Sequence, residues 1–334
     1  MTEQTWPWPP GAATGIGSLP GTDIAEAQRI VLGELPDLPH LPELPARGPG
    51  ADLIGRTAGL LVDLPVELYA ARWRITDRPG RDLRRAQDLL ERDLDQMTEQ
   101  AGEYAGPFKI QAAGPFTLAA DLQLALGRRM LRDPGAVRDL TESLAEGLRA
   151  HVAEVRRRLP HATVLLQLDE PSLPAVLAGR VPTESGFGAY RRIEPGTART
   201  ALNTVITAAD TRVVVHCCAP DVPLELIRSS GATAVALDLN LVEQLDPLGE
   251  ALDAGLGLLA GAAPASPPPD GRAPSSAQVA DRVRQLWQRL GFPTDRLAEQ
   301  VVVTPACGLA GASLAYARAV LTACRDAGRR LHEA

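Results

Sequence analysis

The sequence lacks the features that mark secreted, membrane-spanning and nucleic-acid-binding proteins. Its N-terminus, MTEQTWPWPPG, has no basic stretch followed by an apolar one, as a secretory signal would have. No apolar run approaches the roughly 20 residues that a helix needs to cross a bilayer. The formal net charge of -7 gives no reason to expect nucleic acid or an anionic membrane as a partner. We therefore expect a cytoplasmic protein that acts on a small molecule.

Cysteine is also scarce, with four residues in a chain of 334: Cys217, Cys218, Cys307 and Cys324. A chain of this length buries a substantial core without disulfides, and thiols in the cytosol stay reduced. The four cysteines are therefore better interpreted as metal ligands, nucleophiles or small core residues than as disulfide partners.

Eight short β-rich segments alternate with long segments of helical period. The predicted strands are ATGIGS near Ala12, GLLVDL near Gly59, FKIQAAG near Phe108, TVLLQLD near Thr163, RVVVH near Arg212, TAVALDL near Thr233, LGLLAG near Leu256 and VVVTPACG near Val301. Residues 81–104, 135–159 and 275–292 are predicted helices. No GxGxxG follows the first strand, and no linker or short repeat divides the chain. This pattern predicts an α/β fold, a single (β/α)8 TIM barrel over residues 1–334, with the proline-rich residues 36–50 and 263–276 as loops.

In a barrel of this kind, functional side chains lie where the strands end and the βα loops begin. The predicted strand ends carry Gly17 and Ser18, then Asp63 with Glu67 soon after, Gly114 and Pro115, Asp169 and Glu170, His216 with Cys217 and Cys218, Asp238, and Cys307.

The fifth strand ends in HCC, which points to a metal. Side chains alternate along a strand, so His216 and Cys218 face one way and Cys217 the other. If the pair faces the barrel mouth, Cys307 and Asp238 meet it at the same rim. Two thiolates, an imidazole and a carboxylate suit Zn(II).

The alternative is that these cysteines are small core residues, because one HxC with a distant cysteine is a weak metal signature. We interpret Cys217 and Cys324 in that way. The other histidines lie in loops or charged helical segments and are expected to be solvated, with His40 the one that a loop could bring over the mouth: His40, His151, His161 and His332.

Such a donor set would favour one kind of chemistry. Two thiolates and a carboxylate outweigh the charge of Zn(II), so the metal would lower the pKa of a substrate thiol and leave its thiolate electron-rich. Thiolate alkylation fits this better than hydrolysis, for which zinc usually has more neutral ligands and a bound water.

Two further motifs have both a structural and a functional interpretation. In LQLDEPSL, Asp169 and Glu170 are either a helix N-cap with a first-turn acid or, for Asp169, an acceptor for a substrate ammonium. In GIGS, backbone N–H groups and the Ser18 hydroxyl could hold a carboxylate, or the glycines could only form a tight turn.

Taken together and in this order, GIGSLP, LQLDEP, HCC and TPACGL resemble the C-terminal catalytic barrel of cobalamin-independent methionine synthase, in the uroporphyrinogen decarboxylase/methionine synthase-like superfamily. The resemblance implies zinc held by His216, Cys218 and Cys307, with Asp238 at the strand end where the family has a glutamate. It also implies further site residues: Asp169 for the amino group of homocysteine or methionine, Ile16, Gly17 and Ser18 for its carboxylate, and Glu67 as the candidate for a second amino-group ligand.

The chain departs from the family in two places. It is about one barrel long, whereas full-length family enzymes carry a second, N-terminal barrel that helps to bind the folate. The family also has a proton-donating histidine after the seventh strand, where this chain has Ala262. Methyltetrahydrofolate needs a proton on its leaving nitrogen, whereas methylcobalamin leaves as Co(I) and needs none. The methyl donor could therefore be either methyltetrahydrofolate or a methylated corrinoid carried by a partner protein.

The predicted function is a zinc-dependent methyltransferase that methylates the homocysteine thiolate to methionine. One alternative is a zinc corrinoid:thiol methyltransferase of the same superfamily that acts on another thiol, such as coenzyme M, although such a thiol gives Asp169 no ammonium to bind. A uroporphyrinogen decarboxylase would need no metal. A third alternative is a barrel that binds zinc or an amino acid without turnover.

Overall fold

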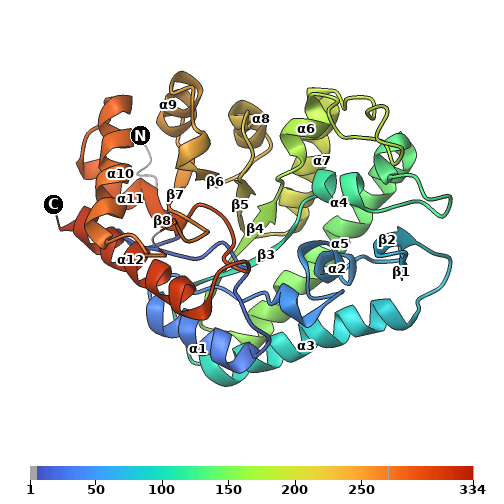
Figure 1. The fold of residues 1–334 in the computed structure, drawn as a ribbon, viewed down its shortest axis with the longest axis horizontal. Coiled ribbons are helices and arrows are strands. Elements are labelled where there is room, and N and C mark those ends of the chain that lie inside the picture. Colours follow the sequence, from blue (N-terminus) through green and yellow to red (C-terminus); the bar gives the residue numbers. More distant parts are fainter. Residues whose placement is uncertain (1–5, 270, 334) are drawn as a thin grey trace.

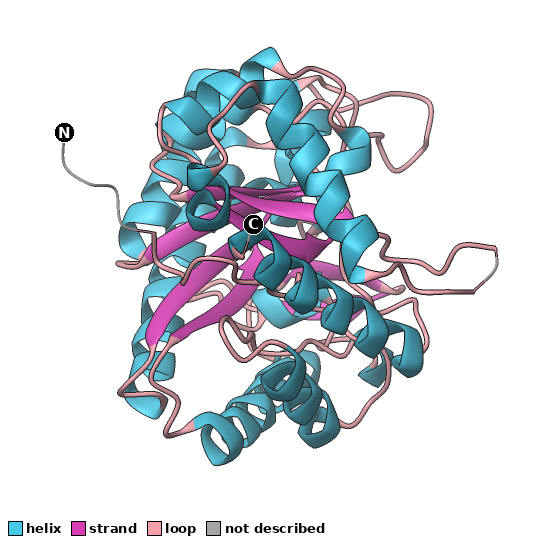
Figure 2. Ribbon diagram, turned by 90° about the vertical axis from the view of Figure 1, so that its left-hand side faces the viewer, coloured by secondary structure: helices cyan, strands magenta, loops and turns pink. Residues whose placement is uncertain are grey.

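The computed structural model describes residues 6–269 and 271–333, and its centre is a parallel sheet of six strands. The strands are β3 (Pro107–Ala113), β4 (Thr163–Asp169), β5 (Arg212–Cys217), β6 (Ala234–Asp238), β7 (Gly257–Ala263) and β8 (Val301–Pro305). They pair in chain order, each parallel to the next. Helices surround the strands (Figures 1 and 2). These six strands confirm six of the eight predicted segments.

Two irregular segments close the sheet into a barrel. Residues 12–19 lie against β8, where the Thr14 N–H donates to a β8 carbonyl at 3.1 Å. Residues 38–44 lie against β3, where the Leu41 N–H donates to a β3 carbonyl at 2.9 Å. The two segments meet each other, because the Glu43 N–H donates to the Gly17 carbonyl at 3.1 Å. The chain therefore folds as the predicted (β/α)8 barrel.

The segment that takes the place of the second barrel strand is not the one that the sequence predicted. Residues 59–64 form no strand in the structure. They follow α2 (Leu53–Ala58), whose first turn is capped by the Asp52 carboxylate, and Asp63 has a left-handed φ of 54° that an extended strand excludes. The proline-rich residues 38–44, expected as a loop, take this position instead. Pro39 and Pro42 have no N–H, so the segment makes isolated bonds in place of a ladder.

A hairpin of β1 (Val66–Tyr69) and β2 (Arg72–Ile75) lies outside the barrel sheet. The helices that connect and cover the strands are α1 (Ile24–Glu34), α3 (Arg81–Ala101), α4 (Pro115–Asp121), α5 (Pro134–Arg158), α6 (Leu173–Leu177), α7 (Pro195–Ala208), α8 (Leu224–Ser229), α9 (Asp246–Asp253), α10 (Ser276–Leu290), α11 (Asp295–Gln300) and α12 (Leu314–His332), with 3-10 turns η1 (Pro45–Arg47), η2 (Met130–Arg132) and η3 (Leu239–Leu241). The predicted helices correspond to α3, α5 and α10. Helix α10 shows why: a Ser275–Gln278 capping box begins it, and Gly291, with a φ of 73°, ends it.

Side-chain alternation gives the barrel two separate cores. One fills the space between the sheet and the helices. The other fills the lower barrel interior and consists of apolar residues, among them Trp8, Leu165, Val214 and Val302. Within the described residues, no helix has the length and hydropathy that would let it span a membrane. Residues 1–5, which belong to the N-terminus considered above, lie outside the described part.

Candidate active site

Three of the predicted metal ligands come together at the carboxyl ends of β5 and β8. His216 lies near the end of β5, Cys218 directly follows this strand, and Cys307 follows β8. One ligand atom from each lies within 4.8 Å of the others, and the two sulfur atoms are 3.1 Å apart. Cys217 points elsewhere and is buried, as alternation along β5 requires. Among the described residues these three form a group that has the spacing of a metal site.

The imidazole of His216 is oriented by a carboxylate. Its Nδ1 lies 2.7 Å from Oδ1 of Asp169, which ends the neighbouring strand β4, and both side chains are buried. Because a carboxylate only accepts hydrogen bonds, Nδ1 carries the proton. The other ring nitrogen, Nε2, is buried and has no protein partner. A histidine fixed in this way presents an unpaired nitrogen, as metal-binding histidines do.

The charges of the group depend on one another. Burial lowers the pKa of His216, but the Asp169 carboxylate and Cys307 outweigh it and raise this pKa to about 9. The hydrogen bond between the two cysteines and the proximity of His216 lower the pKa of the Cys307 thiol to about 4, while the same hydrogen bond raises the pKa of Cys218. The site therefore favours a thiolate at Cys307, which is the form that binds a metal.

Asp238, the fourth predicted ligand, is not part of this group. Its Oδ1 accepts hydrogen bonds from the backbone N–H and the side-chain amide of Asn240, at 2.9 and 2.8 Å. In this way it caps η3 at the end of β6. Its short side chain bonds to a residue two positions along the chain, whereas the three other predicted ligands point toward one another.

The GIGS segment lies beside the metal-binding group. Gly17 has a φ of 146°, and a Cβ there would lie 2.9 Å from the Gln111 side chain, so the position requires glycine. A Cβ on Gly308 would lie 2.1 Å from the Ser18 hydroxyl, and the Leu309 N–H donates to the Ser18 carbonyl at 2.8 Å. Ser18 is therefore next to the residues that directly follow Cys307.

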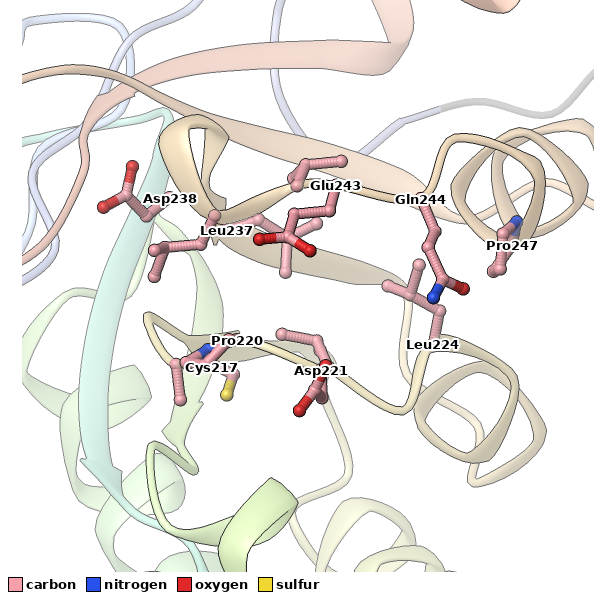
Figure 3. Close-up of a pocket in the computed structure, with 13 residues that line it drawn as sticks. Cys217, Pro220, Asp221, Leu224, Leu237, Asp238, Glu243, Gln244 and Pro247 are labelled. Carbon is pink, nitrogen blue, oxygen red and sulfur yellow. The ribbon is translucent and has the colours of Figure 1, made fainter.

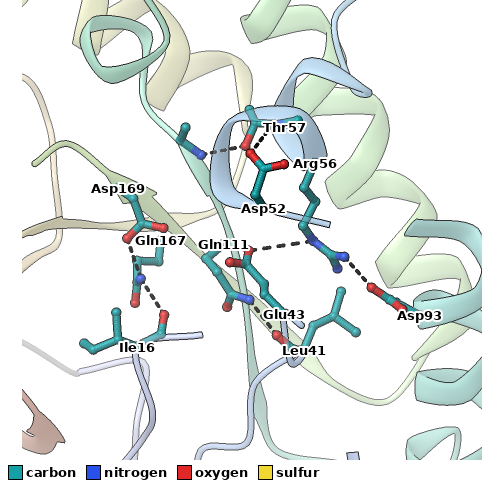
Figure 4. Close-up of polar contacts among 12 residues, drawn as sticks. Ile16, Leu41, Glu43, Asp52, Arg56, Thr57, Asp93, Gln111, Gln167 and Asp169 are labelled. Atoms are coloured by element: carbon teal, nitrogen blue, oxygen red, sulfur yellow. Dashed lines mark hydrogen bonds and ion pairs between the residues drawn. The ribbon is translucent and has the colours of Figure 1, made fainter. Parts of the chain in front are cut away.

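The structure separates Glu67 from the site and brings in Glu43, which the sequence analysis missed. Glu67 lies on β1, and its carboxylate pairs with Arg74 at 2.6 Å within the outer hairpin. Glu43 belongs to residues 38–44, is buried, and lies 3.7 Å from Arg56 (Figure 4). Burial raises the pKa of Glu43 to about 7, and the charge of Asp169 adds to this effect. The signal in the sequence was a single acid within the apolar run LPELP.

Glu170 stabilises the first turn of a helix, which is the structural role considered for it above, but the helix is a different one. Its carboxylate accepts the N–H groups of Phe116 and Thr117, at 2.9 and 2.8 Å, and the Thr117 hydroxyl at 2.8 Å. It therefore stabilises the first turn of α4, not the helix that follows β4. Burial raises the pKa of Glu170 to about 7. Asp169 is free of any capping role and faces the site.

Two of the histidines expected to be solvated are buried. His40 lies inside the barrel against Gly15, where a Cβ would be 2.2 Å from its Nε2. His151 is buried on α5, and burial lowers its pKa to about 4. His161 and His332 are exposed, as predicted. Cys324 lies in the outer core, which also agrees with the prediction.

A sequence model of the family described as cobalamin-independent synthase, catalytic domain, matches residues 11–330. The chain belongs to this family. A search of curated proteins found no match.

Two solved structures share the fold of this cobalamin-independent synthase domain. One is a B12-independent methionine synthase from Shewanella sp. W3-18-1 in complex with selenomethionine, with 13% identity, 97% of this chain and 98% of that chain covered, and a TM-score of 0.63. The other is a methyltransferase from Methanosarcina mazei, with 12% identity, coverage of 96% and 94%, and a TM-score of 0.57. The family match and the shared fold together identify the chain as a catalytic domain of the cobalamin-independent synthase type.

The sequence suggested that Ala262 begins a loop after the seventh strand, but in this synthase domain it does not. Strand β7 continues to Ala263, so Ala262 lies within it and packs in the outer core. Its carbonyl accepts a hydrogen bond from Arg282 at 2.9 Å, and it borders a cavity of about 950 Å³ under the proline-rich loop. Residues 263–276 contain no histidine.

A second cavity of the synthase domain, of about 540 Å³, opens between the loops that follow β5 and β6 (Figure 3). Its apolar lining includes Cys217, Leu224 and Leu237, and its acidic lining includes Asp238 and Glu243. Because Cys217 and Leu237 face the opposite side of their strands from His216, this cavity lies outside the barrel interior.

Proposed function

We propose that the protein is a zinc-dependent methyltransferase that transfers a methyl group to the thiolate of homocysteine and forms methionine. The observation that carries this proposal is the convergence of His216, Cys218 and Cys307, with Nε2 of His216 buried and unpaired. We further propose that residues 1–334 form one catalytic domain.

The donor set fits Zn(II). A buried nitrogen without a partner is costly, and a metal bond would satisfy Nε2 of His216. Two sulfur atoms and an imidazole nitrogen leave one position of a tetrahedral zinc open, as catalytic zinc sites do. When bound, zinc would supply the charge that keeps a substrate thiol ionised at neutral pH. Asp238 is engaged with Asn240 and would leave that position to the substrate.

The surrounding residues suit the other two groups of an amino acid. The backbone of Ile16, Gly17 and Ser18 lies beside the metal-binding residues and would hold the carboxylate. The ammonium would bind to Asp169, whose Oδ2 takes no part in the bond to His216, and to Glu43. Fixing the amino acid at both ends would align its sulfur with the methyl group of the donor.

The donor is either methyltetrahydrofolate or a methylated corrinoid, and turnover distinguishes them. The purified zinc protein is incubated with homocysteine and each donor in turn, and methionine is measured. Because no histidine stands in residues 263–276 to protonate a folate nitrogen, we expect methylcobalamin to support faster turnover. Faster turnover with methyltetrahydrofolate would refute the assignment of the corrinoid. No methionine from either donor, with homocysteine bound, would refute the proposed reaction.

A further inference from the structure

A lysine is buried inside the barrel below the candidate site. Lys109 lies on β3 with no exposed surface, and its Nζ donates to Oε1 of Gln167 at 2.8 Å, to Oε1 of Gln111 at 3.3 Å and to the carbonyl of Ile16 at 3.3 Å. Burial lowers the pKa of Lys109 to about 8, although the charges of Asp169 and Glu43 oppose this. A buried ammonium is expensive to desolvate, so its position calls for a reason beyond packing.

The ammonium fixes the orientation of the Gln167 amide. A lysine can only donate hydrogen bonds, so the carbonyl oxygen of Gln167 must face Nζ. The amide nitrogen then points the other way and donates to Oδ1 of Asp169 and to the carbonyl of Ile16, both at 2.7 Å (Figure 4). An amide turned by 180° would lose all three contacts.

Both halves of the candidate site depend on these bonds. Oδ1 of Asp169 receives Gln167 on one side and Nδ1 of His216 on the other, so a fixed amide fixes the carboxylate and through it the imidazole. The carbonyl of Ile16 receives both Lys109 and Gln167, which holds the segment that continues into Gly17 and Ser18.

We propose that Lys109 is a positioning residue that, through Gln167, orients His216 toward the metal and sets the Ile16–Ser18 backbone for the carboxylate of the substrate. The proposal rests on the proposed function for the identity of metal and substrate. The link from Lys109 to His216 can be tested without either.

The first test is the variant Lys109→Met, which keeps most of the side-chain length and removes the three donors. Zinc affinity is measured by competition with a chromophoric chelator, and we expect a dissociation constant at least 10-fold higher, the effect of losing support behind a metal ligand. The matched control is Gln300→Leu, because Gln300 is also buried and bonds to two carbonyls, those of Leu252 and Leu256, away from the site. The control should lose stability and keep zinc affinity within about twofold.

Because Lys109→Met is a core substitution, a second variant guards against loss of folding. Gln167→Glu preserves shape and pairs with Lys109, but its carboxylate cannot donate to Asp169 or Ile16. This variant should fold, and its dissociation constant for zinc should nevertheless be at least 10-fold higher than that of the wild type. Gln167→Leu is measured alone and together with Lys109→Met, and the two losses of zinc affinity should not add in the double variant, because both residues act through the same chain of bonds.

A spectroscopic measurement follows His216 itself. In the wild type the Nδ1–H proton is bonded to Asp169, so its NMR signal should exchange slowly with water, and in Lys109→Met at least 10-fold faster. The comparison is made on zinc-loaded and metal-free protein, so it tests Lys109 even if the wild type binds no zinc or homocysteine. Unchanged exchange in folded Lys109→Met and Gln167→Glu, with unchanged zinc affinity, would overturn the proposal and leave the proposed function intact.

Discussion

Two substitutions of Asp169 should weaken zinc binding to different extents, Asp169→Asn moderately and Asp169→Ala more strongly. Its bond to Nδ1 of His216, at 2.7 Å and buried, joins a carboxylate to a ring N–H. Such bonds to charged groups contribute about 1.5–3 kcal/mol, against about 0.5–1.5 kcal/mol for neutral ones. Asp169→Asn therefore costs about 1–1.5 kcal/mol, or roughly a five- to tenfold higher zinc dissociation constant. Asp169→Ala, which leaves Nδ1 without a partner, should cost roughly 10- to 100-fold.

The assay is zinc competition against a chromophoric chelator at neutral pH, with thermal unfolding of the metal-free proteins as a check on folding. Asp238→Asn is the matched control, because asparagine also caps helices and Asp238 lies outside the group of three ligands. We expect that control to stay within about twofold of the wild type. Equal affinity for wild type and Asp169→Ala would refute the orienting role, and a large loss in Asp238→Asn would make Asp238 a ligand after all.

Three further predictions concern the ligands, the substrate and pH. Cys307→Ser should lose zinc and activity together, and an active, zinc-free variant seen by metal analysis would count against the site. Glu43→Gln should raise the KM for homocysteine roughly five- to tenfold, because a hydrogen bond from the ammonium to a carboxylate becomes one to a neutral amide. Glu67→Gln, which removes only a partly exposed ion pair with Arg74, should change the KM less than twofold. Similar KM values for the two variants would exclude Glu43. His151 has a pKa of about 4 when folded and near 6.5 when unfolded, so the unfolded chain binds its proton first and stability falls as the pH drops from 6.5 to 4. In urea unfolding between these pH values, the free energy of unfolding of His151→Gln should fall by up to about 3 kcal/mol less than that of the wild type. Identical pH profiles for the two proteins would contradict a buried neutral histidine.

The sequence predicted the central strands well because each is a continuous buried run, as parallel strands are. It misplaced the second barrel position for a local reason. GLLVDL has the composition of a strand, but Asp52 starts a helix just before it and Asp63 takes a left-handed conformation. The segment that replaces it reads as a loop, since prolines interrupt it and only long-range bonds to Gly17 and β3 hold it.

The same distinction applies to the site. His216, Cys218 and Cys307 could be predicted because the carboxyl ends of parallel strands share one rim. Glu43 could not, because its segment was assigned to a loop. The support below the site left a readable trace: FKIQAA and LLQLD place polar residues two apart on the inward face of buried strands. Which amide meets which carboxylate depends on strand register, which only the structure gives.

The central claim is that His216, Cys218 and Cys307 hold zinc and that the zinc receives the sulfur of homocysteine. X-ray absorption at the zinc edge tests this directly, on protein purified without chelators and measured before and after homocysteine is added. We predict about one zinc per chain with two sulfur ligands, and one additional sulfur with homocysteine. Protein without zinc, or a zinc edge that homocysteine does not change, would contradict the account.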